Sequence, residues 1–187
     1  MTLILASASP RRSEILTALG VEFEVVLPEV EELTEGEPER VVVENARRKA
    51  RAVVDRGPGD AVVLGADTEV VLDERVLGKA GDEGQARRRL EALSGRDHAV
   101  LGAIVLLGPN GAERSGVARS TVTFRELDEP TLALYLASGE WRGRAGAYAI
   151  QGLGSILIER LEGDFSNVVG LPVPLFVELA PDLLPKP

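Results

Sequence analysis

The order of apolar segments along the chain constrains its fold more than any other feature of the sequence. Short apolar segments such as 2–6 and 23–28 alternate at first with segments that have helix signals, a pattern typical of an α/β protein. Two long segments that are expected to be strands, 98–108 and 112–126, then follow one another with a Pro-Asn-Gly turn between them. Because such a hairpin interrupts the alternation, the sequence predicts a mixed sheet and not a regular doubly wound parallel one.

Capping and turn residues divide the chain into its expected elements. Ser9 and Pro10 predict the start of a first helix, and Gly20 its end. Further helices are expected over 38–55, 82–93, 128–139 and in the last segment, 171–184. Residues 61–80 are expected to form a buried strand, a turn, and a second strand with a short hairpin at Asp73 and Glu74. The 187 residues are expected to form a single domain, 1–187.

Composition excludes several classes of protein. The formal net charge is −9, whereas a protein that binds the nucleic-acid backbone requires a basic surface. The absence of cysteine excludes disulfide bonds and thiolate metal sites. No apolar run approaches the roughly 18 residues of a transmembrane helix, and the first residues lack the basic region of a signal peptide. We therefore expect a cytoplasmic protein that binds neither nucleic acid nor a membrane.

The segment 7–12, Ser-Ala-Ser-Pro-Arg-Arg, joins the first expected strand to the first expected helix. A helix N-terminus exposes unpaired N–H groups and a partial positive charge, which favour an anion. Ser7 and Ser9 add hydroxyl groups, and Arg11 and Arg12 add guanidinium groups that match phosphate oxygens. The segment is therefore either an anion site or an ordinary capped helix with two solvent-facing arginines.

Five further polar residues are candidates for the same site. Asp67 and Thr68 follow an apolar run, where a carboxylate can act as a general base, bind a metal, or merely shape a turn. Lys49 and Lys79 are notable because only three of the 21 basic residues are lysine, although a solvated helix face would also explain Lys49. Gln151 could hydrogen-bond a nucleobase edge, or simply be a polar residue in a glycine-rich turn.

His98 is the single histidine of the chain, so it cannot form a histidine-based metal site and a structural role is expected. The sequence also lacks a Walker A motif, a GxGxxG motif and a nucleophile elbow. Taken together, the polar segments described above contribute cations, hydroxyls, carboxylates and an amide. That combination favours chemistry at the phosphorus of a nucleotide without a P-loop.

Several segments together resemble the Maf family of nucleoside triphosphate pyrophosphatases: LASASPRR (5–12), ENARRKA (44–50), GADTEVV (65–71), LGKA (77–80), AGAYAIQGLG (145–154) and ERLEGDFSNVVGLP (159–172). They span nearly the whole chain in the family's order and spacing. The resemblance implies an α/β fold like that of inosine triphosphate pyrophosphatase, with a mixed twisted sheet flanked by helices and two lobes around a cleft. It also implies house-cleaning hydrolysis of a nucleoside triphosphate to the monophosphate and pyrophosphate, with Mg²⁺ or Mn²⁺ as cofactor.

The resemblance also implies roles for individual residues. Arg11, Thr68 and Gln151 match the branch of the family that acts on dTTP and UTP, and not the branch that acts on 7-methyl-GTP. Asp67 matches the family's proton acceptor. The positions that match its substrate pocket are Ser7, Arg12, Glu31, Lys49 and Lys79. The chain has Gly143-Arg144 where the family usually has Asp-Lys, so a positive charge is kept and a carboxylate is lost.

These assignments give a hypothesis for the mechanism. The triphosphate lies against the start of the first helix, where four cations neutralise it: Arg11, Arg12, Lys49 and Lys79. Glu31 and Asp67 hold the metal, and Asp67 deprotonates a water that attacks the α-phosphorus. Thr68 and Gln151 hydrogen-bond the pyrimidine, which leaves them unpaired when the wrong base is bound.

Two other functions are alternatives at this point. One is a nucleotidyltransferase, whose N-terminal strand and arginine-containing turn look similar. The other is a non-catalytic nucleotide-binding regulator of cell division. The sequence does not decide which base is preferred, or whether the real substrate is a modified pyrimidine triphosphate. It also leaves the oligomeric state open, with a homodimer among the choices.

Overall fold

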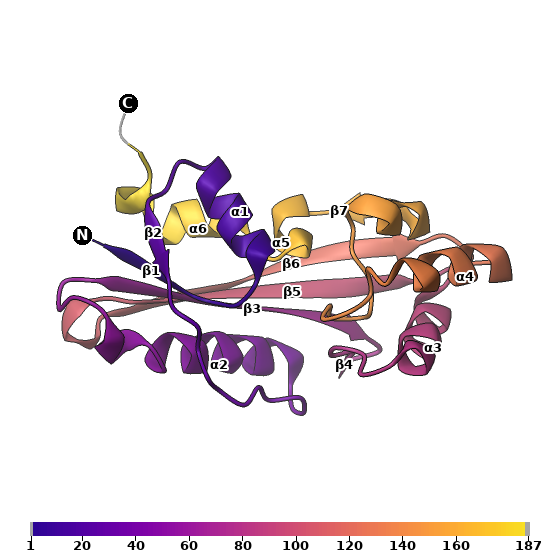
Figure 1. Cartoon of the computed structure of the whole chain (residues 1–187), viewed down its shortest axis with the longest axis horizontal. Coiled ribbons are helices and arrows are strands. Elements are labelled where there is room, and N and C mark those ends of the chain that lie inside the picture. The colour runs from indigo at the N-terminus through magenta and orange to yellow at the C-terminus, as the bar shows by residue number, and fades with distance from the viewer. Residues whose placement is uncertain (1, 186–187) are drawn as a thin grey trace.

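The computed structural model describes residues 2–185 and contains a twisted seven-stranded sheet with helices on both faces (Figure 1). The strands follow the order β2 (Phe23–Val25), β1 (Leu3–Ala6), β3 (Val62–Leu72), β5 (Asp97–Leu107), β6 (Glu113–Phe124) and β7 (Ile158–Glu162), with β4 (Arg75–Val76) paired to the end of β3. β1 pairs in parallel with β2 and β3, whereas the remaining pairs are antiparallel. The mixed sheet predicted from the sequence is therefore confirmed.

Helices cover the two faces and one end of this sheet. Figure 1 shows α2 (Pro38–Arg51) along one face, and α1 (Pro10–Ala18), α5 (Phe165–Val169) and α6 (Val173–Leu179) on the other. α3 (Glu83–Leu93) and α4 (Glu129–Ser138) gather at the far end of the long strands. Short 3₁₀ helices complete the list: η1 (Val54–Arg56), η2 (Pro109–Gly111), η3 (Gly152–Leu157) and η4 (Pro181–Leu183). Between residues 2 and 185, no helix has the length and apolar character needed to cross a membrane.

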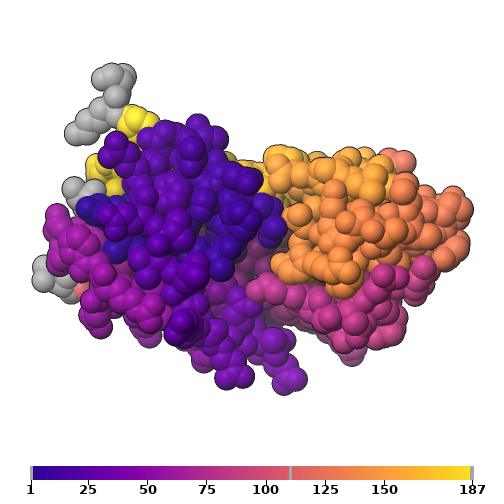
Figure 2. Space-filling view, in the orientation of Figure 1, coloured from indigo at the N-terminus to yellow at the C-terminus, as the bar shows by residue number. Residues whose placement is uncertain are grey.

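The alternating side chains of β3 contact three apolar clusters. Val63 and Val71 pack in the cluster that includes α2. On the other face, Leu64 and Ala66 pack with α1 and α6, and Val70 packs in the cluster that includes α3 and α4. We call the part of the molecule around the cluster with α1 and α6 the N-terminal lobe, and the part around the cluster with α3 and α4 the second lobe. Figure 2 shows the N-terminal lobe as the indigo mass and the second lobe as the orange and magenta mass.

The turn expected within 61–80, which Asp67 and Thr68 could have shaped, is wrong, because β3 continues through these residues as one strand. Its pairing with β5 runs without a break from Val63 to Val71, and these bonds hold the backbone extended. On the opposite edge of β3, β1 pairs only as far as Gly65, and β4 begins to pair at Val71. Among the described residues, no strand pairs with 66–69 on that edge, so β3 has an open edge between the two lobes.

The capping residues predict most helix limits correctly. The side chains of Asp82 and Asp128 cap α3 and α4, and Gly139 ends α4 in the left-handed conformation. The helix expected over 38–55 is shorter than predicted, since α2 ends at Arg51 and η1 follows it. The short helix α5 was not among the predicted elements.

We expect that Gly65→Ala destabilises the fold, because Gly65 sets the distance between β3 and α2. A Cβ at this position would lie 2.1 Å from the carbonyl oxygen of Ala46 and 2.9 Å from the Cβ of Ala50. The free energy of unfolding, measured with urea, should fall by on the order of 1–3 kcal/mol. Gly59→Ala is the matched control, because its Cβ would meet nothing within 4 Å. Equal unfolding midpoints for the two variants would contradict the expectation.

His98 lies inside the cluster of the second lobe and is 3% exposed. Its ring packs edge-on against Phe124 and Tyr148, with centroid distances of 5.0 and 5.3 Å. His98 Nε2 is 2.8 Å from the Tyr148 hydroxyl oxygen. Burial lowers the pKa of His98 to about 4, so the ring is neutral at physiological pH. This position agrees with the structural role expected for His98.

This lowered pKa should make the stability of the fold depend on pH. The unfolded state binds the His98 proton near pH 6.5, whereas the folded state binds it only near pH 4. The stability linked to His98 is therefore fully present above pH 6.5 and is lost as the pH falls through 4. Between pH 7 and 4, unfolding free energies from urea titrations should fall by about 2 to 3 kcal/mol more in the wild type than in His98→Gln. Parallel pH profiles would rule this out.

Candidate functional site

A cleft with a volume of about 480 Å³ lies between the two lobes, at the open edge of β3. Figure 2 shows the indigo N-terminal segment facing the orange segment across the border of the lobes. The lining comes from segments that are far apart in the sequence: Ser7 to Arg12, Pro28, Val30, Glu32, Lys49, Asp67, Thr68, Lys79, Arg142 to Ala145, Tyr148 to Gln151, and Val168 to Gly170. The cleft therefore gathers every candidate residue of the sequence except Glu31.

Arg12 is a buried cation in the wall of the cleft. Its Nε donates to the carbonyl oxygen of Gly170 at 2.8 Å, and its Nη1 and Nη2 donate to the hydroxyl oxygens of Ser7 and Thr68 at 3.0 and 3.3 Å. Burial lowers the pKa of Arg12. Within residues 2–185 no carboxylate forms an ion pair with it. A buried guanidinium with neutral partners favours an anionic ligand.

Arg11 and Ser9 lie at the same helix start. Ser9 is the N-cap residue of α1, as predicted, although its own side chain makes no capping bond and its N–H donates to Ser7 Oγ at 3.1 Å. Arg11 Nε donates to the carbonyl oxygen of Val169 at 3.1 Å. Burial, and then the positive charge of Arg144, lower the pKa of Arg11. Arg11 and Arg144, which come from different lobes, therefore repel one another across the cleft. An anion bound between them would relieve this repulsion.

A chain of alternating charges crosses the floor of the cleft. Lys49 Nζ is 2.6 Å from Asp67 Oδ1 and 2.6 Å from Glu32 Oε1, and Lys79 Nζ is 2.8 Å from Glu32 Oε2. Lys49 and Asp67 are 7% and 4% exposed, whereas the Lys79 side chain is 55% exposed. Burial raises the pKa of Glu32, but the two lysines outweigh it and lower the value to about 2. Glu32 is therefore ionised throughout the physiological range.

Asn45 is a site residue that the sequence analysis missed. It is fully buried in α2, and its Nδ2 donates to Asp67 Oδ2 at 3.2 Å. The same amide accepts the N–H of Leu33 at 2.7 Å and donates to the carbonyl oxygen of Leu33 at 3.0 Å. Asn45 thus joins the glutamate-rich segment 29–37, which we call the acidic loop, to Asp67. Its signal in the sequence is an asparagine inside a helix, where this residue type is unfavourable without a specific partner.

Glu69 is a second buried acid on the same strand, two residues after Asp67. Its Oε2 has no hydrogen-bond partner among the described residues. Burial, and then the negative charge of Asp67, raise the pKa of Glu69 to about 8. Near neutral pH Glu69 is therefore mostly protonated, so it adds little negative charge beside Asp67.

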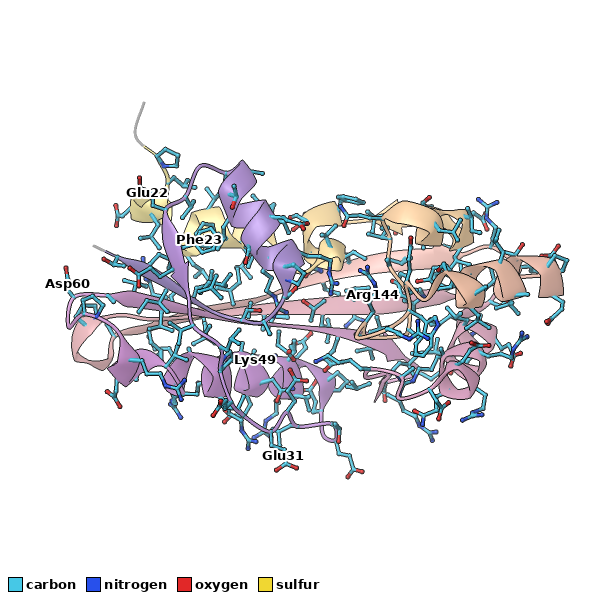
Figure 3. The ribbon with its side chains drawn as sticks, in the orientation of Figure 1. Glu22, Phe23, Glu31, Lys49, Asp60 and Arg144 are labelled. Atoms are coloured by element: carbon cyan, nitrogen blue, oxygen red, sulfur yellow. The ribbon has the colours of Figure 1, made fainter. Side chains whose placement is uncertain are left out.

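Glu31 does not take the place that the sequence suggested for it. Figure 3 shows its side chain pointing away from the ribbon, on the outside of the acidic loop, while Lys49 lies between α2 and the sheet. Glu31 is exposed and absent from the cleft lining, whereas its neighbour Glu32 faces the lysines. Successive side chains of an extended segment point to opposite sides, so the two glutamates cannot both enter the cleft. Of these two neighbouring glutamates, Glu32 and not the predicted Glu31 therefore lies in the cleft.

The acidic groups of the cleft would complete a metal site only together with a ligand. Within the described part of the chain, no group of three or more histidine or acidic side chains could hold a metal ion. Asp67 and Glu32 both contact Lys49 Nζ, so two carboxylates converge on one point. Mg²⁺ is commonly bound by one or two carboxylates and the phosphates of a substrate. The residues present therefore fit an ion that also binds a polyphosphate.

A mixed sheet with a cation-lined cleft at an open strand edge defines an α/β protein with an anion-binding site. Residues 2–183 match the family described as Maf-like protein, and the chain belongs to this family. The chain is 48% identical to a protein of Deinococcus radiodurans over 94% of its own length and 90% of the relative's. It is 47% identical to a protein of Thermococcus gammatolerans, over 95% and 94% of the two chains. Both relatives are named dTTP/UTP pyrophosphatase.

A solved structure from Mycobacterium abscessus, titled nucleoside-triphosphatase / dITP/XTP pyrophosphatase, has the same fold. It superposes with a TM-score of 0.50 at 21% identity, over 99% of this chain and 98% of the other. The α/β fold implied by the resemblance, that of the inosine triphosphate pyrophosphatases, is confirmed.

We expect that Lys49→Met strongly destabilises the protein, because it leaves the buried carboxylate of Asp67 without its cation. The loss in unfolding free energy should be about 3 to 5 kcal/mol. Lys79→Met is the matched control, since its exposed ion pair with Glu32 should contribute less than about 1 kcal/mol. Urea unfolding of both variants measures the difference. Adding Asp67→Asn to Lys49→Met should restore part of the stability; similar losses for the two lysines would show that burial does not matter here.

Proposed function

We propose that the protein hydrolyses nucleoside triphosphates, dTTP and UTP among them, to the monophosphate and pyrophosphate in this cleft. The observation that carries the proposal is Asp67, a buried carboxylate whose two oxygens are bound by Lys49 and Asn45 at the edge of a cleft lined with cations. The names of the relatives from Deinococcus radiodurans and Thermococcus gammatolerans support the same reaction and base preference. The proposal implies a cytoplasmic location, where nucleoside triphosphates are available.

The positive groups of the cleft would bind the triphosphate. Arg11 and Arg12 present guanidinium groups at the start of α1, where the helix dipole also favours an anion. Lys79 is half-exposed at the far side of the cleft, so a phosphate can replace Glu32 as its partner without the cost of burying a new charge. These fixed charges stabilise the negative charge that builds up on the leaving pyrophosphate in the transition state.

Asp67 would act as the general base. Its Oδ1 accepts a hydrogen bond from Lys49 and its Oδ2 accepts one from Asn45, which fixes the carboxylate plane and leaves further lone pairs on both oxygens. In the proposed step Asp67 takes a proton from a water molecule, and the water oxygen bonds to the α-phosphorus. The bond from that phosphorus to the bridging oxygen breaks, and pyrophosphate leaves with its electron pair.

A divalent cation, Mg²⁺ or Mn²⁺, would be held by Asp67 and Glu32 together with phosphate oxygens. When bound, it supplies positive charge that neutralises the phosphates and the leaving group. Lys49 lies between the same two carboxylates and contacts both of them.

Thr68 and Gln151 are the proposed contacts of the pyrimidine base, and Arg11 lines the same cleft. Thr68 Oγ1 already accepts from Arg12 and donates to the carbonyl oxygen of Gly170, which fixes its position. Within residues 2–185, the Gln151 side chain has no hydrogen-bond partner, so its amide is available to a ligand. An amide that must find a matching base edge discriminates strongly, because a wrong base leaves it unpaired.

Replacing Asp67 with asparagine should abolish turnover while keeping the shape of the side chain. We expect pyrophosphate release from UTP to fall by roughly 10²- to 10⁴-fold, the usual contribution of a general base. Asp60→Asn is the control, because Asp60 is exposed and lies far from the cleft (Figure 3). Release at nearly the wild-type rate by Asp67→Asn would exclude Asp67 as the base.

The same assay separates the alternatives. Loss of release in EDTA, with recovery in Mg²⁺ or Mn²⁺, would support the metal requirement. Formation of a sugar nucleotide from UTP and a sugar 1-phosphate would favour a nucleotidyltransferase, whereas binding of UTP without turnover would favour a regulator.

A further inference from the structure

Gln151 is at the tip of a tight turn, residues 149–154, whose two ends touch. Gly152 begins η3 directly after it, with a φ of +63° that favours glycine. A Cβ at Gly154 would lie 2.0 Å from the carbonyl oxygen of Ala149, so there is no space between the ends of the turn. The direction of the Gln151 side chain therefore depends on how these two ends are held.

Glu140 holds the second end of the turn. This residue follows α4, and its Oε1 and Oε2 accept the N–H groups of Leu153 and Gly154, each at 3.1 Å. Both N–H groups belong to the first turn of η3, where no helical partner exists for them. A Cβ at Gly152 would lie 2.8 Å from Glu140 Oε1, so the carboxylate is packed tightly against the residue next to Gln151.

Tyr135, inside α4, holds the first end. Its hydroxyl oxygen accepts the N–H of Ala149 at 3.0 Å. The side chain is fully buried, and burial raises its pKa to about 12, so the hydroxyl stays neutral. The carbonyl oxygen of Glu140 also accepts a hydrogen bond from Nε of Arg144, a cation of the cleft. Both ends of the Gln151 turn and one arginine are thus fixed to α4 and the residues directly after it.

We propose that Glu140 is a positioning residue for base selection, which orients the Gln151 amide by binding the two N–H groups behind it. The inference rests on the proposed function, since it assigns Gln151 to the pyrimidine. An amide discriminates between bases only when its donor and acceptor are held in place before the ligand binds. The contacts of the Glu140 carboxylate are with this turn, so its effect reaches the cleft through Gln151.

The test compares two pyrimidines that differ at the edge an amide would bind. In Glu140→Gln, kcat/KM for UTP should fall about tenfold and that for CTP less than about threefold, because one N–H then faces an amide NH₂ in place of an oxygen. Glu159→Gln is the control, since Glu159 is exposed and has no hydrogen-bond partner among the described residues. In a Gln151→Ala background, Glu140→Gln should leave the UTP:CTP ratio unchanged.

A purely structural role for Glu140 gives different results. In that case UTP and CTP turnover fall by the same factor, or the losses of Glu140→Gln and Gln151→Ala add, and either result overturns the proposal. Tyr135→Phe removes the acceptor at the other end of the turn and keeps the buried ring. It should change the UTP:CTP ratio in the same direction, and an unchanged ratio in both single variants also overturns the proposal.

Amide hydrogen exchange separates failure of this inference from failure of the proposed function. The N–H groups of Leu153 and Gly154 should exchange about tenfold faster in Glu140→Gln than in the wild type, with or without turnover. If the wild type releases no pyrophosphate from any triphosphate, the proposed function fails and base selection fails with it. If the wild type is active and exchange at these two residues is unchanged, the positioning role alone is overturned.

Discussion

The buried ion pair between Lys49 and Asp67 is the interaction on which the site depends. Removing two charges from water is costly, and the cost is offset only when the geometry is good and the remaining polar atoms are satisfied. Here Lys49 also contacts Glu32, and Asn45 binds the second oxygen of Asp67. The pair therefore fixes α2 against β3 and attaches the acidic loop to both. The same contacts that stabilise the floor of the cleft also orient the proposed base.

The open edge of β3 explains why residues adjacent in sequence take different roles. Asp67 contacts Lys49 on the α2 side of the sheet, whereas Thr68 contacts Arg12 on the side of α1. The side chains of a strand alternate between faces, so the two could share one ligand only where the strand edge is uncovered. That condition is met over 66–69, where β1 has ended and β4 has not begun. A triphosphate and its base could then contact both faces of a single strand.

Local signals in the sequence predict the fold and most of the cleft. The hairpin that interrupts the alternation of strand and helix segments indicates the mixed sheet, and Ser9 with Pro10 marks the start of α1. The turn predicted near Asp67 and Thr68 fails because long-range pairing with β5 overrides the local turn preference of this segment. The choice of Glu32 over Glu31 depends on the path of an irregular loop, which has no periodicity to interpret. Asn45 was missed because its partners, Leu33 and Asp67, come from other segments.

The contacts of the two helix-start arginines have a consequence for when the site can form during synthesis of the chain. Arg11 and Arg12 are among the first residues made, yet the carbonyl groups that hold them, those of Val169 and Gly170, lie 158 positions later. A nascent chain on the ribosome therefore has its cations long before it has the backbone that orients them. The cleft is completed only when nearly the whole chain has been translated, so in a partial chain these two cations are not yet held in place.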